Sequence, residues 1–404
     1  RWTLVGEIVE QVQRIEHQHP TVGQELSHAT VHPVLGPLIA VVVLAVSFDV
    51  VRLVGEGLIG HVMDPLFERL WRPVVVWISG LLGAEGILHT LLIGELVEGR
   101  IEFGESFGLL TTGFYIPLAA VLPYVFAFYF VLGILEDSGY LPRLGVLVDN
   151  VMHRLGLHGL TVVPMLMGLG CNVPGALALR VLETRKERFI AATLLSVCVP
   201  CMAQLAMLAG LIGRHGVLAF APVLGSLFVL WVVLGTTMKR FVKGLTPEIL
   251  LDIPPYRFPY WGALAKKLLM RMRGFLREAV PYVLLGVLVV NLLYVLGIIH
   301  WAGVVLSPVV EHWLGLPAEA AGALLIGFMR KDVAVGMLAP LNLSLRQLIV
   351  AGVVLTAYFP CVATFVVLLR ELGVRDMVKA AAIMVVAAFA TGGLLNLILV
   401  GVGL

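Results

Sequence analysis

The sequence predicts an all-α, polytopic membrane protein with internal repeats and broken or re-entrant helices. Of its 404 residues, 59% are hydrophobic and only 13% are charged, and the mean hydropathy is +0.99. Soluble domains carry about 25% charged residues, so a chain this apolar needs the bilayer as its solvent. The net charge of +2 excludes a nucleic-acid-binding role, and four cysteines make no disulfide framework.

Five segments are expected in order. Residues 1–30 read as an amphipathic linker helix, and 31–112 as a first span followed by an acidic, interfacial stretch with helices lying flat on the membrane. Residues 113–238 and 279–404 read as two gate-like repeats, separated by a basic loop at 239–278. Within these segments apolar spans are expected at about 35–54, 113–135, 189–212, 217–238, 279–299, 347–369 and 378–402.

Two further apolar stretches, 160–179 and 321–340, are unsuited to an uninterrupted span. The first contains Gly168, Gly170, Pro174 and Gly175, and the second carries the charged run 330–332. Charges at bilayer depth are costly, whereas a broken segment that lines a polar cavity tolerates them. If both segments leave on the side they enter, the basic loops at 180–188, 239–277 and 370–379 all fall on the cytoplasmic side, with the N-terminus also inside.

The chain repeats itself at a nearly constant interval. Pro123-Tyr-Val recurs as Pro281-Tyr-Val, Gly168 matches Gly327, and Pro200-Cys201 matches Pro360-Cys361. Three expected crossings lie between the two copies, so the second copy is inverted relative to the first. Inverted repeats with paired broken helices are typical of transporters whose substrate site lies where the breaks meet.

The candidate metal ligands are the four cysteines and one amide. Cys171 lies in the first break with Asn172 beside it, Cys198 and Cys201 lie in the next helix, and Cys361 occupies the repeat-equivalent place. The spacing of Cys198 and Cys201 places both on one helix face, and Pro200 between them frees backbone carbonyls. Thiolates favour borderline and soft metals, although small, buried cysteines are also ordinary core residues. All eleven histidines fall in loops, interfacial stretches or span ends.

Other candidates line the gates. Arg330, Lys331 and Asp332 are either a gate or an ion pair that holds the second break open. Glu136 and Asp137 either collect cations at the cytoplasmic mouth or belong to ordinary helix-end chemistry before Gly139. The expected gate and pore residues are Gly170, Pro174, Glu136, Asp137, Pro200, Arg330, Lys331, Asp332 and Pro360. No phosphate loop, His-Glu-x-x-His or Gly-x-Ser-x-Gly motif is present, so no enzyme is expected.

Several motifs resemble the membrane domain of the FeoB family of ferrous iron transporters. They are Leu135-Glu-Asp-Ser-Gly-Tyr140, Gly168-Leu-Gly-Cys-Asn-Val-Pro174, Arg180-Val-Leu-Glu-Thr-Arg185, Gly327-Phe-Met-Arg-Lys-Asp332 and Tyr358-Phe-Pro-Cys-Val-Ala-Thr364. The resemblance implies Fe²⁺ uptake across a bacterial inner membrane, with Cys171, Cys201 and Cys361 along the iron path. Fe²⁺ is then cargo, and no cofactor is held permanently.

The resemblance also implies partners and shows departures. The expected partners are the lipid bilayer and a GTP-binding domain, which is either fused upstream or separate. A small cytoplasmic regulator and assembly into a homo-oligomer are further possibilities. Asp332 stands where the family usually has Glu, and Pro-Cys201-Met-Ala-Gln204 replaces the usual Ser-Cys-Gly-Ala-Arg. Two other classes remain: a carrier of nucleosides or other small organic solutes, and a non-conducting membrane partner of a GTPase.

Overall fold

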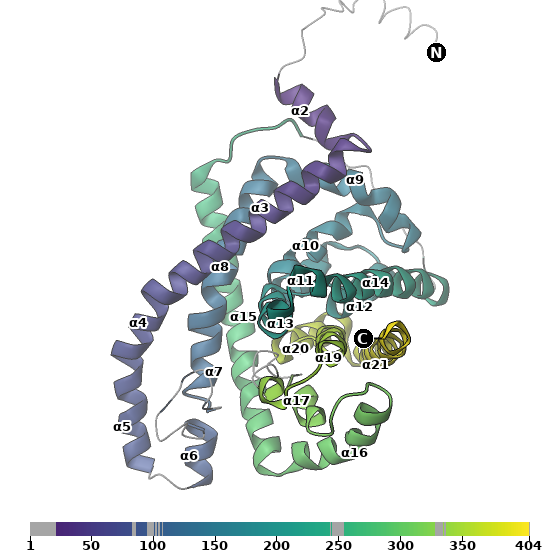
Figure 1. Cartoon of the computed structure of the whole chain (residues 1–404). Helices are drawn as coiled ribbons and strands as arrows, with labels where there is room; N and C mark the ends of the chain where they lie inside the picture. The colour runs from purple at the N-terminus through teal and green to yellow at the C-terminus, as the bar shows by residue number, and fades with distance from the viewer. Residues whose placement is uncertain are drawn as a thin grey trace, which may run out of the picture.

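The computed structural model describes residues 22–82, 86–94, 101, 103, 106, 108–242, 244, 254–327, 334 and 337–403. Within these residues the regular elements are helices, as Figure 1 shows, and this confirms the expected all-α class. Six helical runs in the described part are long and apolar enough to cross a membrane: Leu35–Leu82, Thr112–Asp137, Arg185–His215, Ala221–Phe241, Leu345–Leu372 and Val374–Val402. The chain is therefore a multi-pass membrane protein.

The first helical run is much longer than the sequence indicated. After α2 (Val22–Val31), α3 (Leu35–Leu58) continues without a break through π-helical turns at Ile59–Met63 and Phe67–Trp71, α4 (Asp64–Leu66) and α5 (Arg72–Leu82). Its 48 residues make a rod of about 70 Å, more than twice the hydrocarbon thickness. The sequence expectation ended this span near Val54 and placed separate flat helices beyond it. The prolines did not interrupt the helix: Pro65 lies within the run, just after the π-helical turn Ile59–Met63.

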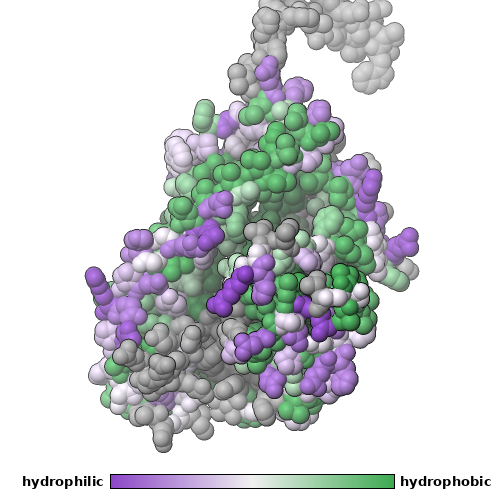
Figure 2. Space-filling view, in the orientation of Figure 1, coloured by the Kyte–Doolittle hydropathy of each residue, from purple (hydrophilic) through white to green (hydrophobic). Residues whose placement is uncertain are grey.

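The outer side of α3 is apolar. Val34, Leu38, Val41, Val46 and Leu53 expose between 56% and 75% of their area. Figure 2 shows hydrophobic atoms gathered along this helix. A soluble protein would not leave such a stripe uncovered, whereas lipid tails are a suitable neighbour for it.

The first repeat follows α6 (Ile87–Leu92). Its elements are α7 (Thr112–Tyr115), a π-helical turn (Ile116–Val121), α8 (Leu122–Asp137), α9 (Tyr140–Arg154), a 3-10 turn (Gly159–Thr161), α10 (Val162–Gly170), α11 (Asn172–Ala178), a 3-10 turn (Leu179–Val181), α12 (Arg185–Cys198), α13 (Met202–Ile212), 3-10 turns at Gly213–His215 and Val217–Phe220, and α14 (Ala221–Phe241).

The second repeat reproduces the first. Its described elements are α15 (Trp261–Val295), α16 (Ile298–His312), α17 (Ala320–Gly327), a 3-10 turn (Ala339–Leu341), α19 (Leu345–Ala357), α20 (Val362–Leu372) and α21 (Val374–Val402). In the repeat α9 corresponds to α16 and α13 to α20, and the two helices of each pair are equally long. Gly139 and Gly297 both precede the first of these pairs in left-handed conformation, so the repeat extends to backbone detail.

The two repeats run in opposite directions. The C-terminal part of α8 lies against the N-terminal part of α15: Glu136 pairs with Lys267 and Arg271, while the guanidinium of Arg271 lies 5.4 Å from the ring of the earlier residue Tyr129. Helices that correspond in the repeat are thus antiparallel, as an inverted repeat requires. α15 begins at Trp261, so the second half of the basic segment expected as a loop is helical.

The first break is a helical hairpin. The backbone is extended at Cys171, with φ −151° and ψ 132°, between α10 and α11. A Cβ placed on Gly175 would lie 3.0 Å from the carbonyl oxygen of Pro164, and a straight helix would separate such residues by about 16 Å. The segment therefore turns back on itself, as the sequence predicted.

The second break has the same close approach. A Cβ on Gly327 would lie 3.2 Å from the Cβ of Ala334, and these positions are the repeat equivalents of Gly168 and Gly175. Gly168 and Gly175 are likewise in contact. The residues between Gly327 and Ala334, including Arg330, Lys331 and Asp332, lie outside the described residues, so their predicted gate role stays a prediction.

Candidate functional site

Cys171 forms the tip of the first hairpin. Its N–H donates to the carbonyl of Met167 at 2.9 Å, and its carbonyl accepts from Gly175 at 3.3 Å. These bonds hold the two half-helices together and leave the thiol at the turn. Gly170, one residue earlier, lies so close to α8 that a Cβ would overlap the ring of Phe128.

Cys201 and Cys361 hold equivalent places in the two repeats. Both are N-cap residues, of α13 and α20, with extended ψ angles of 168° and 156°. The N–H of Cys201 donates to Gln204 at 2.8 Å, and the Cys361 sulfur lies 3.2 Å from the hydroxyl of Thr364. Each cysteine therefore lies at the N-terminus of a helix, where backbone N–H groups point outward.

Three of the four cysteines come together. Cys201 and Cys361 both lie in the neighbourhood of Cys171, although they belong to different helices and Cys361 to the other repeat. α11 packs against α20, which brings the hairpin to the N-terminus that Cys361 caps. No three His, Cys, Asp or Glu side chains in the described part lie close enough to hold one metal ion together.

Cys198 is placed differently from its predicted position. α12 ends at Cys198, and the chain is extended through Val199 and Pro200 before α13 begins. The predicted common helix face of Cys198 and Cys201 is therefore wrong, because Pro200 ends the helix between them. Pro360 lies in the matching break between α19 and α20.

Asn172 supplies an unused oxygen beside the tip. Its side chain is 3% exposed, and its Oδ1 has no hydrogen-bond partner among the described residues. A buried carbonyl oxygen normally has a partner. Pro174 is buried two residues further along. The cavity of about 70 Å³ next to Gly170 is lined almost entirely by apolar side chains of α3, α8 and α10, so it is no site for an ion.

Glu136 and Asp137 are engaged in ion pairs. The ammonium of Lys267 lies 2.6 Å from Asp137 and 3.3 Å from Glu136, and Arg271 reaches Glu136 at 2.8 Å. The hydrogen bond that Lys267 donates to the Asp137 carboxylate raises the pKa of Lys267 above its usual value. These pairs fasten the end of α8 to α15, which favours the structural interpretation over cation collection.

The sequence interpretation missed a buried pair, His158 and Glu187. His158 was counted among the loop histidines, yet its side chain is 2% exposed and its Nε2 lies 3.7 Å from Oε1 of Glu187, which is fully buried. The motif Thr184-x-x-Glu187 before an apolar run marks a helix start, and the structure has that cap. Nothing local in the sequence pointed to the histidine as its neighbour.

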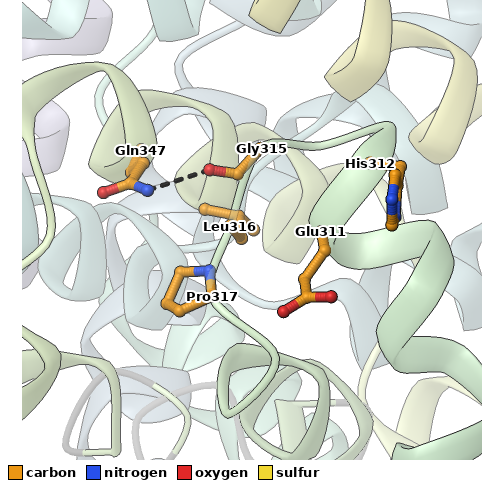
Figure 3. A pocket seen from close by; sticks show the side chains of 6 residues that line it. All are labelled: Glu311, His312, Gly315, Leu316, Pro317 and Gln347. Atoms are coloured by element: carbon orange, nitrogen blue, oxygen red, sulfur yellow. Dashed lines mark hydrogen bonds between the residues drawn. The ribbon is translucent and has the colours of Figure 1, made fainter.

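An open cavity of about 380 Å³ lies at the matching place in the second repeat. Figure 3 shows Gln347 at one side of it, with the carboxylate of Glu311 turned toward Pro317 and His312 pointing away. The Nε2 of Gln347 donates to the carbonyl of Gly315 at 2.9 Å. Gln347 follows Glu187 by the same interval that separates Cys361 from Cys201, so Gln347 and Glu187 are repeat equivalents.

Comparisons with known proteins place these features in a family. The family model described as "Gate: Nucleoside recognition" matches twice, at residues 118–215 and 276–375, and the interval between the two matches is that of the repeat. A model described as "Ferrous iron transport protein B C terminus" matches residues 223–271. No solved structure matches the chain.

The curated relatives are longer than this chain. "Fe(2+) transporter FeoB" of Methanocaldococcus jannaschii is 30% identical over 322 residues, which are 70% of this chain and 48% of the relative. The protein of that name in Staphylococcus aureus is 31% identical over 261 residues, 60% of this chain and 39% of the relative. A "Fe(2+) transport protein A/Fe(2+) transporter FeoB fusion protein" of Porphyromonas gingivalis is 26% identical over 295 residues, 71% and 32% of the two chains.

The chain thus spans less than half the length of these relatives. Within that span the Gate matches, the C-terminal match and the relatives cover both repeats and the segment that joins them. This chain is a membrane-domain protein of the FeoB family.

Proposed function

We propose that this chain carries Fe²⁺ across the membrane along a path between the two gate repeats, past Cys171, Cys201 and Cys361. The relatives named as Fe(2+) transporters support iron as the substrate. The observation that carries the cysteine path is the approach of Cys201 and Cys361, one from each repeat, to the cysteine at the hairpin tip.

The chemistry of these groups suits a transported ferrous ion. Cysteine sulfur is a ligand for borderline metals, and Cys201 and Cys361 occupy equivalent N-cap positions in the two repeats. Asn172 adds a buried oxygen with no partner in the described part. An ion that meets these ligands in succession is held less tightly than in a closed four-ligand site, and this allows it to leave.

Orientation and partners complete the proposal. The basic loops define the cytoplasmic side, with the N-terminus inside and the protein in the inner membrane. A GTP-binding domain acts with the chain, whether fused or separate. The fusion relative from Porphyromonas gingivalis supports a small partner of the transport protein A type.

The test is anaerobic Fe²⁺ flux into liposomes that contain the purified chain. Cys171→Ser is expected to lower uptake on the order of tenfold or more, because a soft ligand is replaced by a hydroxyl. Cys198→Ser is the matched control: Cys198 is buried at the end of α12 without an electrostatic interaction with the other cysteines, and its variant should transport normally. Equal uptake by wild type and Cys171→Ser would rule out the cysteine path.

A second candidate is a carrier of nucleosides or other small organic solutes. The description of the Gate model favours it. So does an aromatic surface at the tip, where Phe128 lies against Gly170 and Tyr129 interacts with Cys171. The same liposomes, given a radiolabelled nucleoside in place of iron, distinguish the two candidates. If neither substrate is taken up, the chain either does not conduct or needs the GTP-binding domain. Adding that domain to the liposome assay distinguishes these two explanations.

A further inference from the structure

Four buried polar side-chain atoms in the described part lack a hydrogen-bond partner. They are Nε2 of His158, Oγ1 of Thr161, Oδ1 of Asn172 and Oε1 of Glu187. Two of them face each other, since Nε2 of His158 and Oε1 of Glu187 are 3.7 Å apart on side chains that are 2% and 0% exposed. That separation is too long for a hydrogen bond, and a buried carboxylate is costly without a compensating charge.

His158 has two neighbours that require different protonation states. Its Nδ1 accepts a hydrogen bond from the N–H of Leu160 at 3.2 Å and so caps the 3-10 turn before α10. This bond needs a neutral ring with its hydrogen on Nε2. A charged carboxylate at Glu187, in contrast, is stabilised by an imidazolium at His158. The other oxygen of Glu187 accepts from the hydroxyl of Thr184 at 2.9 Å, which holds the carboxylate in place.

In the second repeat the equivalent position is occupied by a residue that does not titrate. Gln347, equivalent to Glu187, stands at the same position of a Ser344 cap as Glu187 does at its Thr184 cap. As Figure 3 shows, its amide donates to the carbonyl of Gly315 in the loop before α17. In both repeats, a side chain in the first turn of the helix after the hairpin thus faces the loop before the hairpin. Only the first uses an acid and a histidine.

We propose that His158 and Glu187 form a proton-binding site that controls the stem of the first hairpin. One proton from the aqueous phase binds Nδ1 of His158, and the resulting imidazolium neutralises the carboxylate of Glu187. The N–H of Leu160 loses its acceptor, so the turn at Gly159–Thr161 and the start of α10 are released. The attachment of the Cys171 hairpin at its start therefore weakens as the pH falls. The loop around Gly315 and Gln347 in the second repeat shows no such dependence.

The charged groups around this pair have partners of their own. Asp149 of α9 accepts from the N–H of Gly159 at 2.6 Å and lies 3.3 Å from His153, and Lys239 of α14 donates to the carbonyl of His153. Further groups on packed elements have these partners: Arg143 with Ser27 and the carbonyl of Gly139, Arg188 with the carbonyl of Leu182, Lys186 with that of Gly244, Arg185 and Lys379 with Asp376, Arg180 with Glu371, Arg346 with Asn396, and Arg370 with the ring of Tyr282. Three exposed arginines lie on the same elements: Arg154, Arg240 and Arg375. None of these contacts involves the atoms that His158 and Glu187 turn toward each other.

Hydrogen exchange of the whole chain in detergent, without iron, tests the site. When the pH is lowered from about 8 to about 6, amides at the start of α10 should exchange about fivefold faster after correction for the intrinsic pH effect. Glu187→Gln, which installs the side chain that the second repeat uses, should abolish the change. His158→Gln should abolish it independently. Glu183 is an exposed acid in the loop just before α12, and the Glu183→Gln variant should behave as wild type.

The segment around Gly315 and Gln347 is an internal reference and should show no pH-dependent change in any variant. Wild-type exchange at α10 that is independent of pH, or a pH effect that survives Glu187→Gln, would overturn the proposal. The link between this site and iron flux rests on the proposed function. Because the exchange experiment contains no iron, its failure leaves the transport proposal untouched, and a failed flux assay leaves the proton site untouched.

Discussion

Gly170 sets how closely the hairpin tip approaches α8. It lies against the ring of Phe128, so an added methyl group would overlap that ring. The close approach brings Tyr129 and Cys171 within interaction range. A residue of this kind is constrained by its neighbour rather than by its own backbone angles.

Gly170→Ala is therefore expected to destabilise the protein by about 1–3 kcal/mol, the usual cost of overpacking. Gly210→Ala is the matched control, because a Cβ on Gly210 of α13 meets nothing within 4 Å, and it should stabilise by about 0.5–1 kcal/mol. Thermal unfolding in detergent measures both. A Gly170→Ala protein as stable as wild type would mean that Phe128 can move away.

Lys267 gives a prediction at alkaline pH. Because Asp137 raises the pKa of Lys267 above the ordinary 10.5, the stability from this pair is fully present below pH 10.5 and is lost as pH rises through the higher folded-state pKa. The melting temperature of wild type should exceed that of Asp137→Asn at neutral pH, and the difference should shrink only above about pH 10.5. A melting-temperature difference that already narrows near neutral pH would show that Lys267 is not the titrating group.

At the scale of elements, ion pairs join the two repeats at the ends of their helices. Arg185 at the start of α12 reaches Asp376 at the start of α21 at 2.7 Å, and Arg180 reaches Glu371 at 2.6 Å. The inverted counterpart of the first pair is uncharged, since Leu345 and Gly216 occupy the repeat-equivalent positions. These two pairs therefore tie the repeats together by charge on the basic side.

Asp376→Asn should weaken this tie by no more than about 1 kcal/mol, because the Arg185 side chain is 78% exposed and exposed pairs contribute little. The loss should disappear at high salt, which screens exposed charges. Thermal unfolding at low and high ionic strength checks both statements. A large loss that is independent of salt would instead indicate a buried, packing role for Asp376.

At the scale of the whole molecule, the repeat brings one cysteine from each half to the hairpin tip. This convergence can be tested without iron. A short bifunctional thiol reagent should link Cys171 to Cys361 or Cys201, since both are neighbours of Cys171, and peptide mass spectrometry identifies the linked pair. Cys198 should be absent from the products. Links through Cys198 in preference to Cys171 would contradict the arrangement.

Much of the architecture was readable from the sequence because its causes are local. Hydropathy predicted the membrane class, and the glycine and proline pattern around Cys171 predicted the break. Motifs repeated at a nearly fixed interval predicted the two halves. The long first helix was misjudged, because the helix continues through Pro65, which lies just after the π-helical turn Ile59–Met63. The end of α12 was misjudged for the opposite reason, since Pro200 terminates the helix.

The sequence by itself determined the class of protein, the inverted repeat and the positions of its breaks, since all three follow from local side-chain chemistry and backbone preference. Only the tertiary structure decided which residues meet. Three contacts join residues that are distant in the sequence. Cys171 lies near Cys361, and Glu136 and Asp137 form ion pairs with Lys267 of α15. His158 faces Glu187. Such contacts depend on how helices pack, which no local pattern encodes.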